Sequence, residues 1–212
     1  MREPRIAAVP RVFITSTELS EQLLQRLFNT LPPARAALAS RLARPESVIQ
    51  SVLGFCLVRY ALYALTGQIF SHDWQIGAHG KPCLPGGEAC FNLSHTAHAV
   101  AAAVSFDEVG IDIEAVAPHH PRIASRICSP EELAVLQASP DPVLSLVRLW
   151  SAKEAEGKRL GTGLKNPESL AVDQVQITAF SASNVPHVLA ITPAKAPLTV
   201  EWVEPGQLLL ER

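Results

Sequence analysis

The chain has 212 residues, of which 48% are hydrophobic and 18% are charged, and its formal net charge at pH 7 is -2. This balance excludes an intrinsically disordered chain and the strongly basic footprint of a nucleic-acid-binding protein. The length suffices for one large domain or for two small domains that share a core.

Cysteine usage and the N-terminal residues indicate the compartment. The four cysteines show no CxxC spacing and lie in mainly apolar stretches, which favours reduced thiols over a disulfide framework or a structural zinc site. The first 20 residues lack the apolar core of a signal peptide, and no run of 18 apolar residues occurs in the chain. We therefore expect a cytoplasmic protein without a membrane partner.

The N-terminal segment predicts a strand, a helix and a basic stretch. Val12–Ile14 is apolar and β-branched, and Ser16-Thr17-Glu18 offers cap residues for a helix that ends near Phe28. After Pro32-Pro33, three arginines follow that are either phosphate ligands or solvated surface cations: Arg35, Arg41 and Arg44.

The clearest helix prediction runs from Pro45 to Leu65, because its apolar residues are spaced for burial and Gly67 follows as a stop signal. Its segment Leu57–Tyr60 (LVRY) resembles Leu146–Leu149 (LVRL) further along the chain. Two similar halves that meet near residue 107 would explain this likeness, and a chance match of four residues remains the alternative.

Two short segments carry candidate phosphate-binding groups. Lys81 lies between Gly80 and Pro82, so a turn presents its ammonium group to an anion. Ser94 and His95 end a short strand, where a hydroxyl group and an imidazole can converge on a phosphate, although such a turn is often only a turn. No G-x-S-x-G elbow surrounds Ser94, which argues against a nucleophilic serine.

Ala99–Phe106 is small, apolar and β-compatible, and the turn Asp107-Glu108 predicts a hairpin with the strand Val109–Glu114. Alternation places the three apolar residues of that second strand on one face, and Asp112 and Glu114 side by side on the other. Two such carboxylates suit Mg²⁺ and a substrate phosphate, or they are solvated acids on a strand edge. We expect them to be exposed, so that replacing Asp112 leaves the fold intact.

Two helices carry further charged candidates. Ser129-Pro130-Glu131-Glu132 predicts a helix start with a capping box, which leaves a general-base role for Glu132 open. In the helix that includes Leu149–Lys158, Glu154 and Lys158 lie one turn apart. They form either a metal ligand with a phosphate contact or an ordinary surface salt bridge.

Taken together, Gly-Lys-Pro, Phe-Asn-Leu-Ser-His, Val-Gly-Ile-Asp-Ile-Glu and Trp-Ser-x-Lys-Glu-Ala-x-x-Lys occur in this order between Lys81 and Gly163. This arrangement resembles the 4'-phosphopantetheinyl transferases of the surfactin-synthetase-activator type. The resemblance implies an α+β fold: a monomeric pseudo-dimer of two similar α/β halves, residues 1–107 and 108–212. Each half would be a small antiparallel sheet packed on a long helix, with the active site in the cleft between them.

The resemblance also implies the reaction. The 4'-phosphopantetheine group of coenzyme A would be transferred to a serine of an apo acyl or peptidyl carrier protein, with release of adenosine 3',5'-bisphosphate. Mg²⁺ would bind to Asp112, Glu114 and Glu154. The implied coenzyme-binding residues are Arg44, Lys81, Ser94, His95, Lys153 and Lys158.

The catalytic residues implied by the resemblance are Glu132, Glu154 and Lys158. Glu132, Glu154 or a water on the metal would take the serine proton, and we favour Glu132 because it stands twenty residues after Asp112, like the proposed base of the family. Glu156-Gly157 departs from the aromatic or aliphatic pair common at this place, and a mid-helix glycine costs about 1 kcal/mol relative to alanine. This departure keeps a coenzyme- or carrier-binding paralogue as one alternative. A metal-dependent nucleotide phosphohydrolase, which would use the same carboxylates and lysine, is the other.

Overall fold

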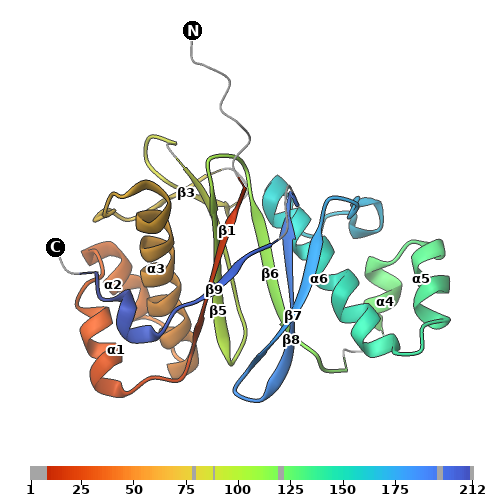
Figure 1. Ribbon diagram of the computed structural model, residues 1–212, viewed down its shortest axis with the longest axis horizontal. Coiled ribbons are helices and arrows are strands. Elements are labelled where there is room, and N and C mark those ends of the chain that lie inside the picture. The colour runs from red at the N-terminus through yellow and green to blue at the C-terminus, as the bar shows by residue number, and fades with distance from the viewer. Residues whose placement is uncertain (1–8, 78–79, 88, 119–121, 195–197, 211–212) are drawn as a thin grey trace, which may run out of the picture.

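The computed structural model describes residues 9–77, 80–87, 89–118, 122–194 and 198–210, and Figure 1 labels its elements. The first part of the chain forms β1 (Arg11–Ser16), α1 (Glu21–Phe28), α2 (Pro33–Ala39), α3 (Pro45–Thr66), β2 (Gln75–Ile76), β3 (Pro82–Cys83), β4 (Cys90–His95) and β5 (Ala99–Ser105). The second part forms β6 (Gly110–Ala115), α4 (Arg122–Ile127), α5 (Pro130–Gln137), α6 (Pro142–Leu160), η2 (Pro167–Ser169), β7 (Gln176–Ala182), β8 (Val185–Thr192), β9 (Val200–Trp202) and η3 (Pro205–Leu208). The predicted α+β class is confirmed.

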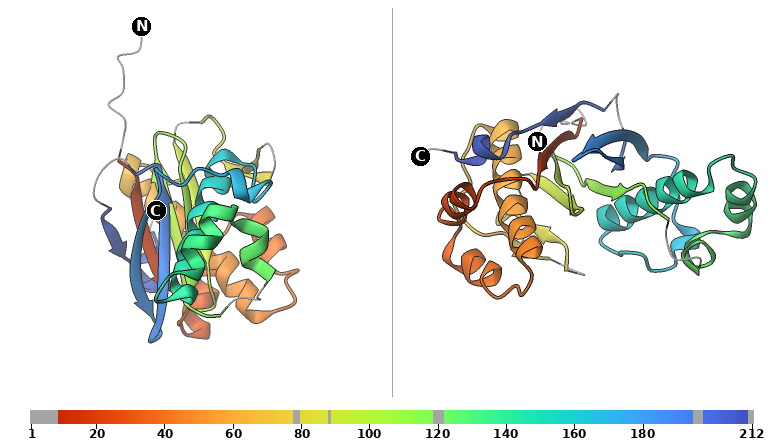
Figure 2. Two further views of the ribbon diagram at one scale, coloured as in Figure 1. Left: turned by 90° about the vertical axis from the view of Figure 1, so that its right-hand side faces the viewer. Right: turned by 90° about the horizontal axis from the view of Figure 1, so that it is seen from below.

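Two sheets lie between two long helices. One sheet has the strand order β4-β5-β1-β9 and the other has the order β6-β8-β7. Strands β1 and β9 are parallel, and the other neighbouring strands of these sheets are antiparallel. Helix α3 packs on the first sheet and α6 on the second, so the two helices lie on opposite sides of the molecule (Figure 1). Seen from below, the molecule is elongated, with α1 and α2 at one end and α4 and α5 at the other (Figure 2).

The hydrophobic core follows the alternation of the strands. One cluster lies between α3 and the first sheet and includes Phe13 and Val100. A second cluster lies between the two sheets and includes Val109, Ile111 and Ile113 of β6, which confirms that these three residues share one buried face. The opposite face of β6 is therefore turned to α6, and there the two acidic residues of the strand are found.

Helix α3 is the core helix of the first sheet. It is long and apolar enough to cross a membrane by length and composition alone. Ten of its 22 residues are buried, among them the run from Val52 to Arg59. Gly67 follows in the left-handed conformation (φ 73°), as its stop signal predicts. The predicted helix, Pro45–Leu65, matches the observed one within a residue.

The predicted start of the first helix is wrong by one turn. The side chain of Ser20 accepts the hydrogen bond from the backbone N–H of Leu23, so Ser20 is the cap residue in place of Ser16-Thr17-Glu18. The predicted end at Phe28 is confirmed. Several hydroxyl or carboxylate residues precede this helix, and the sequence does not say which of them caps it.

The predicted hairpin between Ala99–Phe106 and Val109–Glu114 is also wrong. Strand β5 pairs with β4 on one side and with β1 on the other, which leaves it no free edge. Strand β6 pairs with β8 instead. Asp107-Glu108 therefore takes the chain from one sheet to the next and does not close a hairpin.

The C-terminal segment returns to the first sheet. Strand β9 pairs with β1, and Val203 and Leu208 are buried in the cluster under α3. A division of the chain at residue 107 therefore separates two groups of consecutive elements, except that the segment from Val200 to Leu208 packs with the first group.

Candidate active site

A buried ion pair joins α6 to β6. The ammonium group of Lys158 donates hydrogen bonds to Oδ1 of Asp112 (2.7 Å) and to Oγ of Ser94 (3.1 Å). The Ser94 hydroxyl in turn donates to the same carboxylate oxygen (2.8 Å). Asp112 is 3% exposed and Ser94, on β4, is 7% exposed. Three of the motifs from the sequence thus meet at one point.

The close approach of α6 to β6 explains why this pair is buried. A Cβ atom on Gly110 would lie 2.0 Å from the carbonyl oxygen of Ala155, so only glycine lets the helix backbone rest on the strand there. Asn92 of β4 accepts a hydrogen bond from the backbone N–H of Ile111 (3.0 Å) and ties the first sheet to β6. The expectation that Asp112 is exposed is therefore wrong, because α6 covers that face of the strand.

Glu114 and Glu154 lie beside this pair. Burial, and then the charge of Asp112, raise the pKa of Glu114 to about 7, although Trp150 donates a hydrogen bond to its carboxylate (3.1 Å). Burial also raises the pKa of Glu154, with the charge of Lys158 opposing the shift and that of Asp112 adding to it. Three carboxyl groups thus gather near one ammonium group, which forms its ion pair with Asp112.

The chemistry of these side chains fits a hard cation. Oδ2 of Asp112 is buried and has no hydrogen-bond partner among the described residues, which leaves a lone pair free for a ligand. Within the same residues, however, no three carboxylate, imidazole or thiolate groups stand close enough together to form a ready-made metal site. The Lys158 ammonium group supplies the positive charge beside these carboxylates. To bind one metal ion together, the carboxylate groups would have to move closer to one another.

The raised pKa of Glu114 predicts how stability depends on pH. Between its ordinary value near 4.5 and about 7, the folded chain holds a proton that the unfolded chain has lost, so the free energy of unfolding should fall as pH rises through this window. Glu114→Gln should flatten this decline, and above pH 7 without Mg²⁺ it should melt higher than the wild type. Added Mg²⁺ should stabilise the wild type more at pH 8 than at pH 5.

Thermal melting of both proteins from pH 4.5 to 8.5, with and without Mg²⁺, tests this prediction. The two proteins share all other titrating groups, so their difference isolates Glu114. Parallel pH profiles of the two would show that this carboxylate does not titrate near neutrality.

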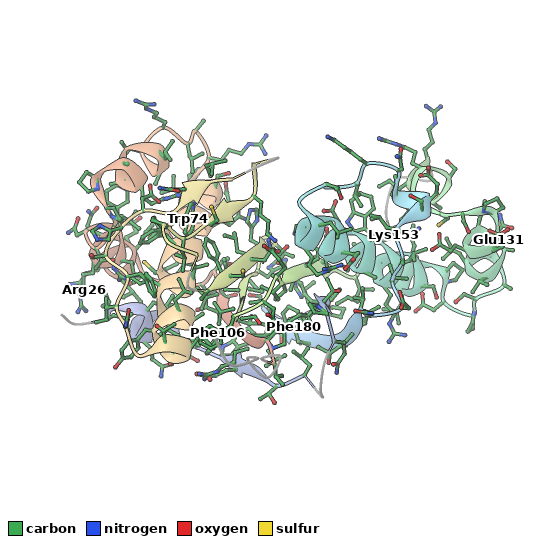
Figure 3. The ribbon with its side chains drawn as sticks, turned by 90° about the horizontal axis from the view of Figure 1, so that it is seen from above. Arg26, Trp74, Phe106, Glu131, Lys153 and Phe180 are labelled. Carbon is green, nitrogen blue, oxygen red and sulfur yellow. The ribbon has the colours of Figure 1, made fainter. Side chains whose placement is uncertain are left out.

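Glu132 and Lys153 form a separate pair. Oε2 of Glu132 accepts from the backbone N–H of Ser129, which confirms the capping box, and from the ammonium group of Lys153 (2.6 Å). Lys153 is fully buried and also donates to the carbonyl oxygen of Ile127 (2.6 Å). Figure 3 shows it among the helices of the second part of the chain. No hydrogen bond or ion pair between described residues connects this pair to Asp112 or Lys158.

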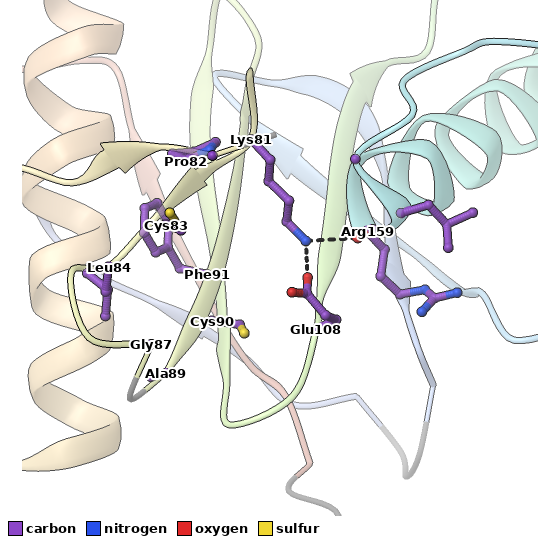
Figure 4. A pocket seen from close by; sticks show the side chains of 13 residues that line it. Lys81, Pro82, Cys83, Leu84, Gly87, Ala89, Cys90, Phe91, Glu108 and Arg159 are labelled. Atoms are coloured by element: carbon purple, nitrogen blue, oxygen red, sulfur yellow. Dashed lines mark hydrogen bonds and ion pairs between the residues drawn. The ribbon is translucent and has the colours of Figure 1, made fainter. Parts of the chain in front are cut away.

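The family resemblance implied that Lys153 binds coenzyme A. In the structure, however, its ammonium group is paired with protein groups, the carboxylate of Glu132 and the carbonyl oxygen of Ile127. Lys81 is in a similar situation, because its ammonium group pairs with Glu108 and donates to the carbonyl oxygen of Arg159 (2.8 Å; Figure 4). Lys81 thus bridges the loop before β3 and the end of α6. It lines a pocket of about 630 Å³, and on its other side a pocket of about 350 Å³ that Lys158 also lines.

His95 lines another pocket of about 350 Å³, together with Arg35 and Ser51. Burial lowers the pKa of His95, and the nearby charge of Lys158 lowers it further. Arg35 is held by an ion pair with Asp73 (2.7 Å) and lies 4.1 Å from the ring centre of Trp74. Arg44 is the exposed residue before α3 and does not line this pocket. Among the three N-terminal arginines, the structure thus brings Arg35 to His95.

An α+β fold in which strand and helix carboxylates surround a single lysine is suited to handling phosphate groups with a metal ion. Residues 108–204 match the family model of the 4'-phosphopantetheinyl transferase superfamily. The chain is 32% identical over 154 residues to the 4'-phosphopantetheinyl transferase ffp of Bacillus subtilis, which covers 70% of this chain and 68% of that relative.

Two further relatives extend the comparison. The identity is 28% over 193 residues with the 4'-phosphopantetheinyl transferase Sfp of Bacillus subtilis (strain 168), covering 89% of this chain and 84% of the relative. It is 30% over 142 residues with enterobactin synthase component D of Salmonella typhi, covering 64% and 59%. The chain belongs to the 4'-phosphopantetheinyl transferase superfamily, and its enzyme class is that of a 4'-phosphopantetheinyl transferase.

Proposed function

We propose that this enzyme transfers the 4'-phosphopantetheine group of coenzyme A to a serine of an apo acyl or peptidyl carrier protein, releasing adenosine 3',5'-bisphosphate. The observation that carries the proposal is the contact of Lys158 with Asp112 and Ser94, because it gathers phosphate-binding chemistry from three motifs beside a pocket. Phosphoryl transfer is catalysed mainly by positioning and by charge stabilisation, which such a cluster can supply.

We also propose that the molecule is a monomeric pseudo-dimer with its active site between the halves 1–107 and 108–212. In support, β1, α3, β4 and β5 follow one another in the first half as β6, α6, β7 and β8 do in the second. The corresponding strand orders, β4-β5-β1 and β7-β8-β6, also agree. The segment from Val200 onward would be the exception, because it belongs to the second half of the chain but adds its strand β9 to the sheet of the first half.

Asp112, Glu114 and Glu154 are the proposed Mg²⁺ ligands. When bound, Mg²⁺ would neutralise charge on the pyrophosphate of coenzyme A. Lys158 would leave its contact with Asp112 and donate to the leaving phosphate. Glu132 is still the proposed acceptor of the serine proton, since Ser129 and Lys153 fix the orientation of its carboxylate, as proton transfer requires. Glu154 is the alternative acceptor because it lies in the Lys158 cluster.

The pocket beside His95 is the proposed place for the 3'-phosphate, with Arg35 as its cation in place of Arg44. His95→Ala and Arg35→Ala should then weaken the binding of coenzyme A much more than that of dephospho-coenzyme A, which lacks this phosphate. A hydrogen bond to a charged group contributes about 1.5 to 3 kcal/mol, or about 10- to 150-fold in affinity. Calorimetric titration of both ligands measures the difference, and Arg44→Ala is the matched control. Equal losses for the two ligands would give the pocket another role.

The transferase reaction itself is tested with a panel of apo carrier proteins and coenzyme A. We expect adenosine 3',5'-bisphosphate to appear only when an apo carrier is present, together with the mass increase of one phosphopantetheine group on the carrier. A binding paralogue would release no nucleotide, whereas a phosphohydrolase would release product without any carrier. The carrier modified fastest also identifies the pathway that the enzyme serves.

A further inference from the structure

Glu156 stands where the motif departs from its usual pattern, and it is tied down by three hydrogen bonds. It is 8% exposed and accepts from the hydroxyl of Thr192 (2.8 Å) and from two nitrogens of Arg159, Nε (2.9 Å) and Nη2 (2.5 Å). Thr192 is fully buried at the end of β8. A carboxylate in place of an apolar side chain thus links α6 to the second sheet through a specific polar contact.

This contact lies where the helix touches the sheet most closely. Thr192 is the cross-strand partner of Gly110, and a Cβ on Gly110 would lie 2.8 Å from the backbone nitrogen of Arg159. A contact of bare backbone on glycine fixes the height of a helix above a sheet, but it presents no side chain that would stop the helix from turning about its axis. The hydrogen bond from Thr192 to Glu156 opposes such a turn near the C-terminal end of α6, as the hydrogen bond from Trp150 to Glu114 does near its middle.

The rotation of α6 decides where Lys158 points. The ammonium group of a lysine lies far from the helix axis, at the end of a four-carbon side chain, so a modest rotation of the helix shifts it out of hydrogen-bond range. Lys158 follows Glu156 by two residues, and Asp112 follows Gly110 by two residues along β6. Because α6 turns as one body, a rotation that took Glu156 away from Thr192 would also take Lys158 away from Asp112, so the two contacts hold the same orientation of the helix.

Gly157 completes this arrangement. A Cβ there would lie 2.4 Å from the carbonyl oxygen of Gly163, because the chain after α6 folds back and the backbone N–H groups of Thr162 and Gly163 donate to the Gly157 carbonyl (3.0 and 3.1 Å). With the loop packed so closely, an apolar side chain has no room at position 157. Glu156-Gly157 therefore fits the packing of α6 against β8 and the following loop, and it is not a packing defect.

We propose that Glu156, held by Thr192 and Arg159, is a positioning residue that sets the direction of Lys158 in the transfer reaction. The inference rests on the proposed function, in which Lys158 contacts the reacting phosphates. Glu156 itself touches neither the coenzyme nor the carrier serine in this proposal. Its effect passes through the orientation of α6 alone.

Thr192→Val and Thr192→Ser form the matched pair that tests the proposal. Valine keeps the size of threonine but removes the hydroxyl group, whereas serine keeps the hydroxyl. We expect Thr192→Val and Glu156→Ala to lower kcat by about 10- to 100-fold, the usual range for residues that orient a reactive side chain, with KM for coenzyme A within about twofold of the wild type. Thr192→Ser should retain most of the wild-type kcat.

A second measurement separates positioning from a general loss of structure. In the Lys158→Ala background, Glu156→Ala should cause no further loss of single-turnover rate, because the group that it positions is already gone. An undiminished loss in that background, or equal kcat for the valine and serine variants, would overturn the positioning role and leave the proposed function intact. Wild-type turnover of Lys158→Ala alone would overturn the role of Lys158 in the proposed function and the inference with it.

Discussion

Replacing Lys158 by alanine is expected to slow phosphopantetheine transfer by about 10²- to 10³-fold, the scale on which enzymes lose rate when one group that stabilises transition-state charge is removed. A surface i,i+4 partner of Glu154 would contribute only a few tenths of a kcal/mol and nothing to the rate. Among the ion pairs of the described residues, Lys158 is joined to Asp112 and not to Glu154. The surface salt-bridge interpretation thus has no support in the structure.

Lys158→Ala should also be less stable than the wild type. The expectation that Asp112 is exposed did not predict this loss. Lys158→Ala leaves Asp112 buried without its cation, and breaking a buried pair costs up to about 3–5 kcal/mol, less here because 26% of the Lys158 side chain is exposed. Asp112→Asn/Lys158→Ala removes both charges and should melt above Lys158→Ala. Both variants should nevertheless transfer phosphopantetheine slowly.

Denaturant unfolding and a carrier mass-shift assay on the same preparations measure the two quantities. Rates that recover together with stability in the double variant would mean that Lys158 serves only to neutralise Asp112. A slow Lys158→Ala variant that is still folded at the assay temperature would assign Lys158 to the reaction, since the double variant also lacks the proposed metal ligand Asp112.

Elements set by local signals were predictable from the sequence. Helix α3 has a buried apolar face and ends at a left-handed glycine, and both features are written in consecutive residues. The β7–β8 hairpin was not predicted. Both residues of its turn, Ser183 and Asn184, have positive φ, which serine rarely adopts, so the sequence carries no clear signal for this turn. The pairing of β6 with β8 could not be predicted from local sequence, because β5 directly precedes β6 in the chain and was the nearer candidate partner.

The site was predictable in its residue types and not in its contacts. The motifs singled out Asp112 and Lys158, but their ion pair spans 46 residues and depends on how closely α6 lies on Gly110. The family resemblance implied that Lys153 binds coenzyme A, and only the packing of α5 and α6 shows that Glu132 neutralises its charge. Contacts of this kind depend on tertiary packing, which no local sequence pattern shows.

Glu154→Gln is expected to lower transfer at least about a hundredfold at a Mg²⁺ concentration that saturates the wild type, because an uncharged amide is a poor ligand for a hard cation and supplies no counter-charge. Part of the rate should return as Mg²⁺ is raised. The stability of Glu154→Gln should not fall together with its rate. Burial raises the pKa of Glu154, so its ionised form is unfavourable in the fold, and glutamine should melt at or above the wild type when Mg²⁺ is absent.

Two measurements on one pair of variants therefore decide whether Glu154 is a metal ligand. Glu131→Gln is the matched control, since Glu131 is an exposed helix carboxylate that accepts a hydrogen bond from the Ser129 hydroxyl and lies away from the Lys158 cluster. In the wild type and in Glu131→Gln, Mg²⁺ should raise the melting temperature, whereas in Glu154→Gln this rise should shrink, since binding of an ion stabilises the fold only as far as the ion is bound. An unchanged Mg²⁺ response together with slow transfer would make Glu154 the proton acceptor in place of Glu132. An unchanged response with normal transfer would remove it from the site.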